Sequence, residues 1–246
     1  MSSPSPEQPS ETPAIAWRRI QAAATAAISL SLLSVLALSQ ELIPPVLVFG
    51  VLYLAVAGVV WRLITNKWAS IVGAVLVALG IAGNAPFLIE DISHPETWGS
   101  FAPAAVMLVG AVAAVGAAVM ALRAAPVERA RSFSMGALVL GAALVVATLG
   151  LSFATSSDTA EAGDVTVVAE GAEFPETLEI AAGGAGIFLE NKDLLRHTFV
   201  IEDQDVKVEM PGGKTRRVEV DLPAGEYRFI CDVPGHERME GTLTVR

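Results

Sequence analysis

Residues 229–239 decide the character of the C-terminal third of the chain, and they read Phe229-Ile230-Cys231-Asp232-Val233-Pro234-Gly235-His236-Glu237-Arg238-Met239. This stretch holds the only cysteine of the 246 residues and one of only three histidines. A second histidine, His197, lies 34 residues before Cys231, in the sequence Leu195-Arg196-His197-Thr198-Phe199. A thiol, two imidazoles and a thioether are therefore available to one site, if the fold brings the two segments together.

These four side chains are the ligand types of a mononuclear blue-copper centre. In such a centre two imidazoles and a thiolate form a trigonal plane, and a thioether binds weakly on the axis. Sulfur ligands are soft and select copper over harder cations. The residues predict a site for one copper ion whose chemistry is the transfer of single electrons: His197, Cys231, His236 and Met239.

Each of the four residues also has an ordinary explanation when it is taken alone. A single cysteine at a strand end is usually a small buried hydrophobe, and a single methionine usually fills a core. A histidine before Thr198 could be a solvated surface residue. Their grouping in a segment with no other cysteine or histidine favours a shared metal site over four unrelated roles.

The composition divides the chain into an apolar part and an acidic part. The hydrophobic fraction is 53% and the mean hydropathy is +0.56, values that indicate a membrane protein with a smaller soluble part. Residues 158–246 hold 19 acidic and 9 basic residues and so carry the whole formal charge of −10. This acidic surface disfavours nucleic acid and favours basic protein partners.

The apolar part contains five stretches, each close to the ~20 residues that cross a bilayer as a helix. They are residues 21–39, 43–61, 70–89, 101–122 and 133–154, and no Lys, Arg, Asp or Glu lies inside any of them. We therefore expect a five-helix transmembrane domain over residues 20–154, in contact with membrane lipid. Residues 1–19 begin with a run rich in Pro and Ser and are expected to form a disordered N-terminus.

Charged residues between the stretches predict the orientation in the membrane. The seven Lys and Arg residues of this part all fall on one side. The charged residues on the other side are all acidic: Glu41, Glu90, Asp91 and Glu96. By the positive-inside rule, the N-terminus is cytoplasmic and the C-terminal domain lies outside the cytoplasmic membrane. The first stretch could instead be a signal sequence cleaved after Ser39, but its apolar run is long for one, so an uncleaved helix is favoured.

The residues within the stretches limit what the membrane part does. The five stretches contain no histidine and no ionisable residue, so neither a haem site nor a proton relay is expected inside them. We expect this part to serve as an anchor or as a docking scaffold. The third histidine, His94, lies in a loop on the outside and is interpreted as incidental.

After residue 154 the pattern changes to a polar linker, residues 155–163, and then to a β domain over residues 164–246. As a flexible coil, the linker would span roughly 15–18 Å and hold the domain near the membrane. Eight short runs rich in Val, Ile, Thr and Phe, separated by turn residues, predict a β-sandwich. The runs are residues 165–168, 177–180, 186–189, 198–201, 206–208, 217–220, 227–230 and 242–245.

Three ordered segments of residues 164–246 resemble the cupredoxin family, in particular its small plastocyanin-like and rusticyanin-like domains. The segments are Asn191-x-Asp193-x3-His197-x-Phe199, Pro223-Ala224-Gly225-Glu226-Tyr227-x-Phe229-x-Cys231, and Cys231-x2-Pro234-Gly235-His236-x2-Met239-x-Gly241. The resemblance implies a Greek-key sandwich with one type 1 copper ion on His197, Cys231, His236 and Met239. It also implies that electrons pass through the edge of His236, within an apolar patch formed by Val233, Pro234 and Gly235.

The expected function is therefore that of a membrane-anchored blue-copper protein, which carries single electrons between redox proteins outside the cytoplasmic membrane. Its partners would be basic, such as a c-type cytochrome, or a membrane oxidase or reductase. Thr198 and Asp232, beside the ligands, are candidates for tuning the copper.

Catalysis is not expected, because a dinuclear copper centre needs two cysteines, and multicopper oxidases and nitrite reductases need more than three histidines. A copper-binding, copper-delivery or copper-sensing membrane protein without an electron-carrier role stays open as the alternative.

Overall fold

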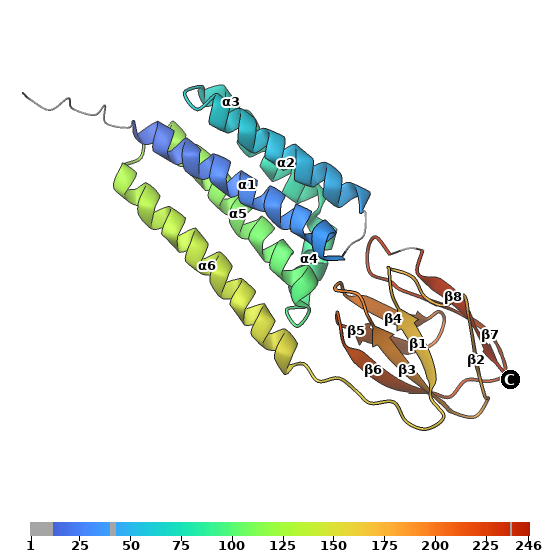
Figure 1. The fold of residues 1–246 in the computed structure, drawn as a ribbon. Helices are drawn as coiled ribbons and strands as arrows, with labels where there is room; N and C mark the ends of the chain where they lie inside the picture. The colour runs from blue at the N-terminus through green and yellow to red at the C-terminus, as the bar shows by residue number, and fades with distance from the viewer. Residues whose placement is uncertain (1–11, 40–42, 237) are drawn as a thin grey trace, which may run out of the picture. The chain divides into compact units, whose positions relative to one another are not determined.

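The computed structural model describes residues 12–39, 43–236 and 238–246, and within them six helices precede eight strands (Figure 1). Four of the helices, α1, α2, α5 and α6, are each long and apolar enough to cross a membrane. The expected order of apolar helices followed by an all-β domain is confirmed. The helices are α1 (Pro13–Ser39), α2 (Pro44–Arg62), α3 (Lys67–Gly83), α4 (Ala85–Ser93), α5 (Trp98–Leu122) and α6 (Val127–Ala154).

The stretch 70–89, expected to be one span, is divided between two helices. α3 ends at Gly83 and α4 begins at Ala85, with a bend of 65° between their axes. Pro86 lies in the first turn of α4. Because proline has no backbone N–H, the helical hydrogen-bond ladder of α3 cannot continue through it. The helices therefore supply four candidate spans, or five if α3 and α4 together form one.

The expectation of a disordered N-terminus over residues 1–19 is wrong for residues 13–19, which form the first turns of α1. Trp17 is fully buried, and its indole N–H donates to the carbonyl oxygen of Ala125 at 2.9 Å. Arg18 is also buried and donates to the carbonyl oxygen of Ile64 at 2.8 Å. These contacts with distant residues stabilise the start of the helix. The rest of this predicted segment, residues 1–11, lies outside the described residues.

The same two hydrogen bonds show that the basic residues of the helical part share one end of the helices. The bond from Arg18 joins the start of α1 to the turn between α2 and α3, which Arg62 and Lys67 flank. The bond from Trp17 joins it to the turn between α5 and α6. Arg19 directly follows Arg18, and the other Arg residues of the helical part, residues 123, 129 and 131, lie at or near that second turn.

One face of α1 carries polar side chains that are buried against other helices. The Gln21 amide donates to the carbonyl oxygen of Ser70 at 2.8 Å, and the Ser70 hydroxyl donates back to the Gln21 side chain at 2.5 Å. About two helical turns after Gln21, the Ser29 hydroxyl donates to the carbonyl oxygen of Gly50 at 2.7 Å. Polar groups away from water need such partners, so these bonds join α1 to α2 and α3.

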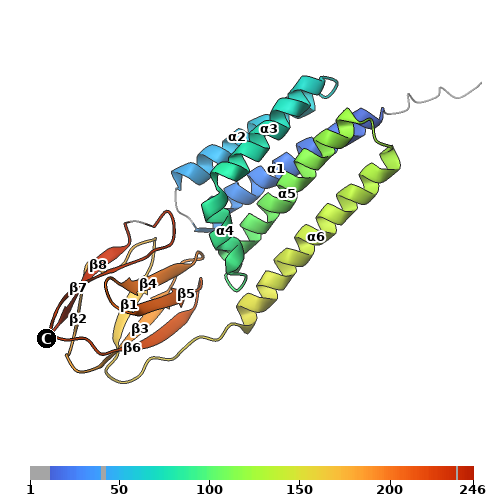
Figure 2. The same cartoon turned by 180° about the vertical axis from the view of Figure 1, so that it is seen from behind.

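The β domain is a sandwich of two sheets, which Figure 1 and Figure 2 show from opposite sides. One sheet has the strand order β1-β3-β6 and the other has the order β2-β8-β7-β4-β5. β1 pairs with β3, and β2 with β8, in parallel, while the other neighbours are antiparallel. The strands are β1 (Val165–Ala169), β2 (Thr177–Ile180), β3 (Ala185–Asn191), β4 (His197–Ile201), β5 (Val206–Met210), β6 (Thr215–Val220), β7 (Gly225–Ile230) and β8 (Glu240–Val245).

The core of the sandwich is built by the alternation of buried and exposed side chains along each strand. β3, for example, buries Ile187, Leu189 and Asn191 and turns the residues between them outward. The rings of Phe199 and Phe229, both fully buried, contact each other in a tilted arrangement with 5.3 Å between their centroids. Burying apolar surface of this kind contributes about 25 cal/mol per Å², so the two sheets hold each other in a fixed register.

The strand pairing gives the domain two distinct ends. At one, here called the His197 end, β4, β6 and β8 begin and β3, β5 and β7 finish. At the other, here called the Gly184 end, β1 and β3 begin and β2 and β8 finish. Residues that are far apart in the sequence therefore meet at the His197 end.

The linker 155–163, expected to be a free coil, is partly held by the β domain. The backbone N–H of Asp158 donates to Thr215 at 3.2 Å, and the Asp158 carboxylate accepts the backbone N–H of Arg217 at 2.9 Å. Arg216 also donates to the carbonyl oxygen of Ser156 at 2.8 Å. These bonds along β6 fix the first half of the linker, which a polar composition alone could not reveal.

Candidate metal centre

His197 is the first residue of β4 and is held there by the loop that precedes it. The Asn191 side chain, itself 2% exposed, donates to the carbonyl oxygens of Leu195 at 2.9 Å and Met210 at 2.7 Å. The Asn191 side-chain oxygen accepts the backbone N–H of Asp193 at 2.9 Å. This one side chain closes the loop between β3 and β4, and so it determines where the imidazole of His197 lies.

The loop from Cys231 to Met239 is closed by its own backbone. Cys231 N–H donates to Met239 at 2.9 Å, and Met239 N–H donates to His236 at 2.9 Å. His236 N–H donates to Val233 at 3.0 Å, across a turn in which Gly235 has φ +92. A side chain is strained at that φ, so the glycine is required. The turn returns His236 toward Cys231.

The structure brings three of the four predicted ligands together. Nδ1 of His197 lies 3.0 Å from Nδ1 of His236, and Sγ of Cys231 lies 3.6 Å from Nδ1 of His236. The three donor atoms all lie within 4.8 Å of one another. Among the described residues they are the group of His, Cys, Asp and Glu atoms that converges in this way. The two imidazoles and the thiol therefore face one common point.

These donors fit a single soft metal ion. Metal–imidazole bonds are about 2.0–2.1 Å long, so two nitrogens 3.0 Å apart can bind one ion together. A set of two nitrogens and one sulfur suits copper better than calcium or magnesium, which take oxygen ligands. His197 and Cys231 are 1% and 4% exposed, so little water competes with them for the metal.

Met239 completes the predicted ligand set as a buried residue of the same loop. Its side chain is 1% exposed and belongs to the apolar core. Its backbone is bonded to both Cys231 and His236, which holds it beside them. The assignment of its thioether as the weak axial ligand stays a prediction.

Asp193, which the sequence analysis names in a motif without a role, is a partner of His197. Its carboxylate accepts from Nε2 of His197 at 2.8 Å, and it also accepts the backbone N–H groups of Gly171 at 2.8 Å and Ala172 at 3.0 Å. Although burial opposes its ionisation, the bonds from His197 and the two amides lower the pKa of Asp193 to about 2. Burial likewise opposes the charged form of His197, but the bonds to Asp193 and Cys231 raise its pKa.

The sulfur of Cys231 is prepared to act as a thiolate. Burial raises the pKa of a thiol, yet hydrogen bonds with His197 and His236 and from the backbone N–H groups of Thr198 and Val233 lower that of Cys231 to about 5. The Thr198 N–H lies 3.4 Å from Sγ. A thiolate is the form that binds metals, so the site favours ligation at neutral pH.

Thr198 and Asp232, expected beside the ligands, form a network that links the two segments. The Thr198 hydroxyl donates to the Asp232 carboxylate at 2.7 Å and accepts the Asp232 backbone N–H at 2.9 Å. The same hydroxyl is 3.6 Å from Sγ of Cys231, a longer contact. Lys207 pairs with the Asp232 carboxylate at 2.7 Å. The network ties β4 to the loop that begins at Cys231.

Arg196 is a second residue that sequence reasoning missed. Its side chain is only 2% exposed, and its guanidinium pairs with the carboxylates of Glu90 and Glu209. An arginine is rarely buried unless it is paired in this way. The one signal in the sequence is its place directly before His197.

His94 does not join the group of converging donors. Its ring bonds Glu96 at 3.0 Å and lies 3.9 Å from Glu90. These contacts with carboxylates lie near the C-terminal end of α4, and the interpretation of His94 as incidental stays a prediction.

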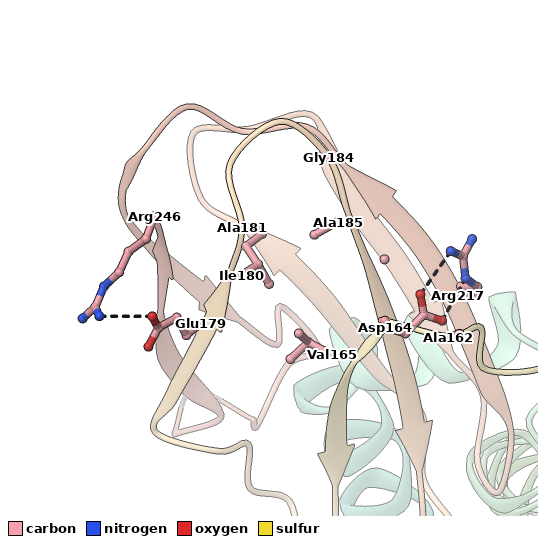
Figure 3. Close-up of a pocket in the computed structure, with 12 residues that line it drawn as sticks. Ala162, Asp164, Val165, Glu179, Ile180, Ala181, Gly184, Ala185, Arg217 and Arg246 are labelled. Atoms are coloured by element: carbon pink, nitrogen blue, oxygen red, sulfur yellow. Dashed lines mark hydrogen bonds and ion pairs between the residues drawn. The ribbon is translucent and has the colours of Figure 1, made fainter.

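A pocket of about 530 Å³ lies at the Gly184 end, away from the candidate ligands (Figure 3). Its charged side chains are paired with each other, Arg217 with Asp164 and Arg246 with Glu179. These pairs satisfy the charges of the lining that a ligand would otherwise use.

Several solved structures are similar to the C-terminal part of the chain. A Cu-containing nitrite reductase from Thermus scotoductus SA-01 is 26% identical with a TM-score of 0.30, and the match covers 37% of this chain and 24% of that one. The chain therefore spans about a quarter of that enzyme's length. Amicyanin from Paracoccus versutus is 17% identical with a TM-score of 0.30, over 35% of this chain and 85% of that one.

A copper binding protein, solved in its apo form, is 25% identical with a TM-score of 0.29, over 37% of this chain and 96% of that one. No curated protein sequence matches the chain. The family model that matches is that of the cupredoxin-like domain, over residues 141–245, which include all eight strands and the four predicted ligands. The C-terminal part of this chain is therefore a cupredoxin-like domain that follows a set of candidate membrane spans.

Proposed function

We propose that the chain is a membrane-anchored type 1 copper protein that carries single electrons between redox proteins outside the cytoplasmic membrane. It acts as a carrier rather than as an enzyme. The observation that carries the proposal is the convergence of two imidazole nitrogens and one sulfur within 4.8 Å, at the His197 end of a cupredoxin-like domain.

Bound copper would supply a one-electron couple, held by His197, Cys231 and His236 with Met239 as the axial ligand. The chain's own residues keep these ligands in place before any metal binds. Asp193 orients the His197 ring, and the backbone of the 231–239 loop orients His236. Ligands that are fixed in this way need little rearrangement when the charge of the site changes, which favours fast electron transfer.

His236 is the route by which electrons would reach the surface. It is half-buried, whereas His197 is 1% exposed. The half-buried residues Val233 and Pro234 and the exposed Gly235 lie beside it. An apolar rim around one partly exposed ligand is suited to brief contacts with a protein partner. The acidic charge of residues 158–246 would attract a basic partner and speed the encounter.

The candidate spans support the location. Four or five helices are apolar enough to cross a membrane, and the basic residues share one end of these helices. By the positive-inside rule, that end is cytoplasmic and the copper domain lies outside.

The test is the colour and the redox activity of the copper-loaded full chain. We expect an intense blue absorption that Cys231→Ala abolishes and His197→Ala weakens or reshapes, because the colour arises from charge transfer between the thiolate and Cu(II). His94→Ala is the matched control and should leave the colour unchanged. A colourless, copper-loaded parent chain would contradict the proposal.

A second measurement separates electron transfer from copper delivery. An electron carrier is reduced and reoxidised repeatedly while it keeps its metal. Loss of the copper to an acceptor protein during these cycles would favour delivery instead.

A further inference from the structure

We infer that the His197 end of the β domain has a docking partner within its own chain, the segment of residues 84–105 that contains α4 and the start of α5. This segment and the β domain belong to the same compact unit, which comprises Ser34–Ile43, Asn84–Ala105 and Ala142–Arg246. The docking itself does not depend on the proposed function. Its effect on electron transfer rests on that function, because the contact lies at the surface through which we propose that electrons pass.

Three contacts between described residues carry the inference. The Arg196 guanidinium pairs with the Glu90 carboxylate of α4. A Cβ built on Gly235 would lie 3.5 Å from the Phe87 ring of α4. A Cβ built on Gly99, in α5, would lie 2.3 Å from the carbonyl oxygen of Leu194.

All three contacts lie beside the candidate ligands. Leu194 and Arg196 precede His197, and Gly235 precedes His236. Gly99 is needed for the close approach, because any side chain there would collide with the backbone of Leu194. An ion pair, an aromatic ring and a glycine contact together form an interface that is specific in charge and in shape.

Arg196 forms the ion pair that links the two sides of this interface. The guanidinium is 2% exposed and lies between Glu90 on one side and Glu209 of β5 on the other. When Glu90 is replaced, Arg196 keeps Glu209, so the β domain itself stays folded while the link to α4 is lost. An external redox protein that uses the Gly235 patch competes with Phe87 for the same surface. The segment 84–105 thus acts as a partial cover. It leaves Gly235 exposed, but it must move before such a partner can pack on the whole patch.

The experiment measures the docking without copper, so that it does not depend on the proposed function. Nitroxide labels are placed in the full chain by Ser93→Cys, at the exposed end of α4, and Glu226→Cys, at the exposed start of β7, in a Cys231→Ser background. Pulsed electron paramagnetic resonance then gives the distribution of distances between the two labels. We expect one narrow distribution that Glu90→Gln broadens. Glu96→Gln is the matched control, because Glu96 bonds His94 and not Arg196.

A broad distribution in the parent protein, or a Glu90→Gln variant as narrow as the parent, would overturn the docking. In the copper-loaded chain without labels, Glu90→Gln should also speed oxidation by a basic cytochrome by up to about fivefold at low salt, as expected for the loss of one partly exposed ion pair. An unchanged rate would refute the role of the segment as a cover. A colourless parent chain, by contrast, would contradict the proposed function and leave the distance result valid.

Discussion

Replacing Asp193 by Asn should raise the reduction potential of the copper site. The carboxylate accepts from Nε2 of His197 at 2.8 Å, while Nδ1 of the same ring faces the other ligands. The negative charge therefore lies behind a copper ligand and favours Cu(II) over Cu(I). An outer partner of this kind also makes the imidazole a stronger donor. Asparagine keeps the size of the side chain but removes the charge.

The size of the effect follows from the distance. With a metal–nitrogen bond of about 2 Å, the carboxylate would lie about 7 Å from the ion. One unit charge at that distance contributes ~2.4 kcal/mol at an effective dielectric constant of about 20. Asp193 is 11% exposed, and solvent reduces the contribution to about 1–2 kcal/mol. Since a tenfold change in equilibrium is 59 mV for one electron, we expect a rise of about 40–90 mV.

The assay is a redox titration of the copper-loaded full chain, followed by its blue absorption. Asp205→Asn is the matched control. It removes the same charge from the β4–β5 turn, where five residues of strand separate it from the site by about 17 Å, well beyond the screening length of ~8 Å at physiological salt. A shift for Asp193→Asn no larger than that of the control, or a fall in potential, would refute the reasoning.

The pKa of Asp193 gives the stability of the copper-free chain a pH dependence with a definite sign. Its folded pKa of about 2 lies below the ordinary value of 3.8. The stabilising contribution of the carboxylate is therefore fully present above about pH 4 and is lost as the pH falls through about 2. In the copper-free protein, the difference in unfolding free energy between the parent and Asp193→Asn, measured by chemical denaturation, should shrink over this window. A difference that stays constant down to pH 2 would show that the charge of Asp193 is not its cause.

The copper-free chain should show thiolate absorption from Cys231 with a midpoint near pH 5, because its pKa is lowered from 9.0 to about 5; an ultraviolet pH titration with a midpoint near 9 would contradict this. Protease added to intact spheroplasts should remove residues 158–246 and spare residues 1–17, and protection of the copper domain would refute the orientation. Stopped-flow oxidation by a basic c-type cytochrome should be faster than by an acidic one of similar potential and should slow as salt rises, whereas a flat salt series would leave the acidic surface a role in solubility alone. Gly241→Ala should lower the temperature at which the blue colour is lost, because a Cβ there would lie 2.3 Å from the Phe229 ring and overpacking costs about 1–3 kcal/mol; Gly150→Ala, where a Cβ meets nothing within 4 Å, is the control.

Much of the fold could be predicted from short-range patterns. All eight strands lie where the alternation of apolar residues and the turn residues between them predict, and their ends differ from the prediction by a residue or two. Apolar stretches similarly predict helices, because crossing a bilayer requires an uninterrupted run of such residues. The chemistry of the site was also evident, since a chain with one cysteine and three histidines offers few ways to combine them.

Local patterns failed where distant residues decide local structure. Residues 13–19 are helical because Trp17 and Arg18 find partners more than 40 residues away. The first half of the linker is ordered because β6 offers it hydrogen bonds. In both cases, the segment alone is compatible with disorder, and its order comes from contacts that no window of sequence contains.

By itself, then, the sequence determined the element types, the two-part organisation and the donor atoms available for a metal. Only the tertiary structure decided how those donors meet. The pairing of Val200 with Ile230 sets β4 beside β7 and so places Cys231 near His197. The tertiary structure also decided the contacts of Asp193 with His197 and of Arg196 with its two carboxylate partners. Strand propensity and ligand identity are properties of single residues and short runs, whereas register and ion pairing depend on which distant segments pack together, and packing is settled by the whole core at once.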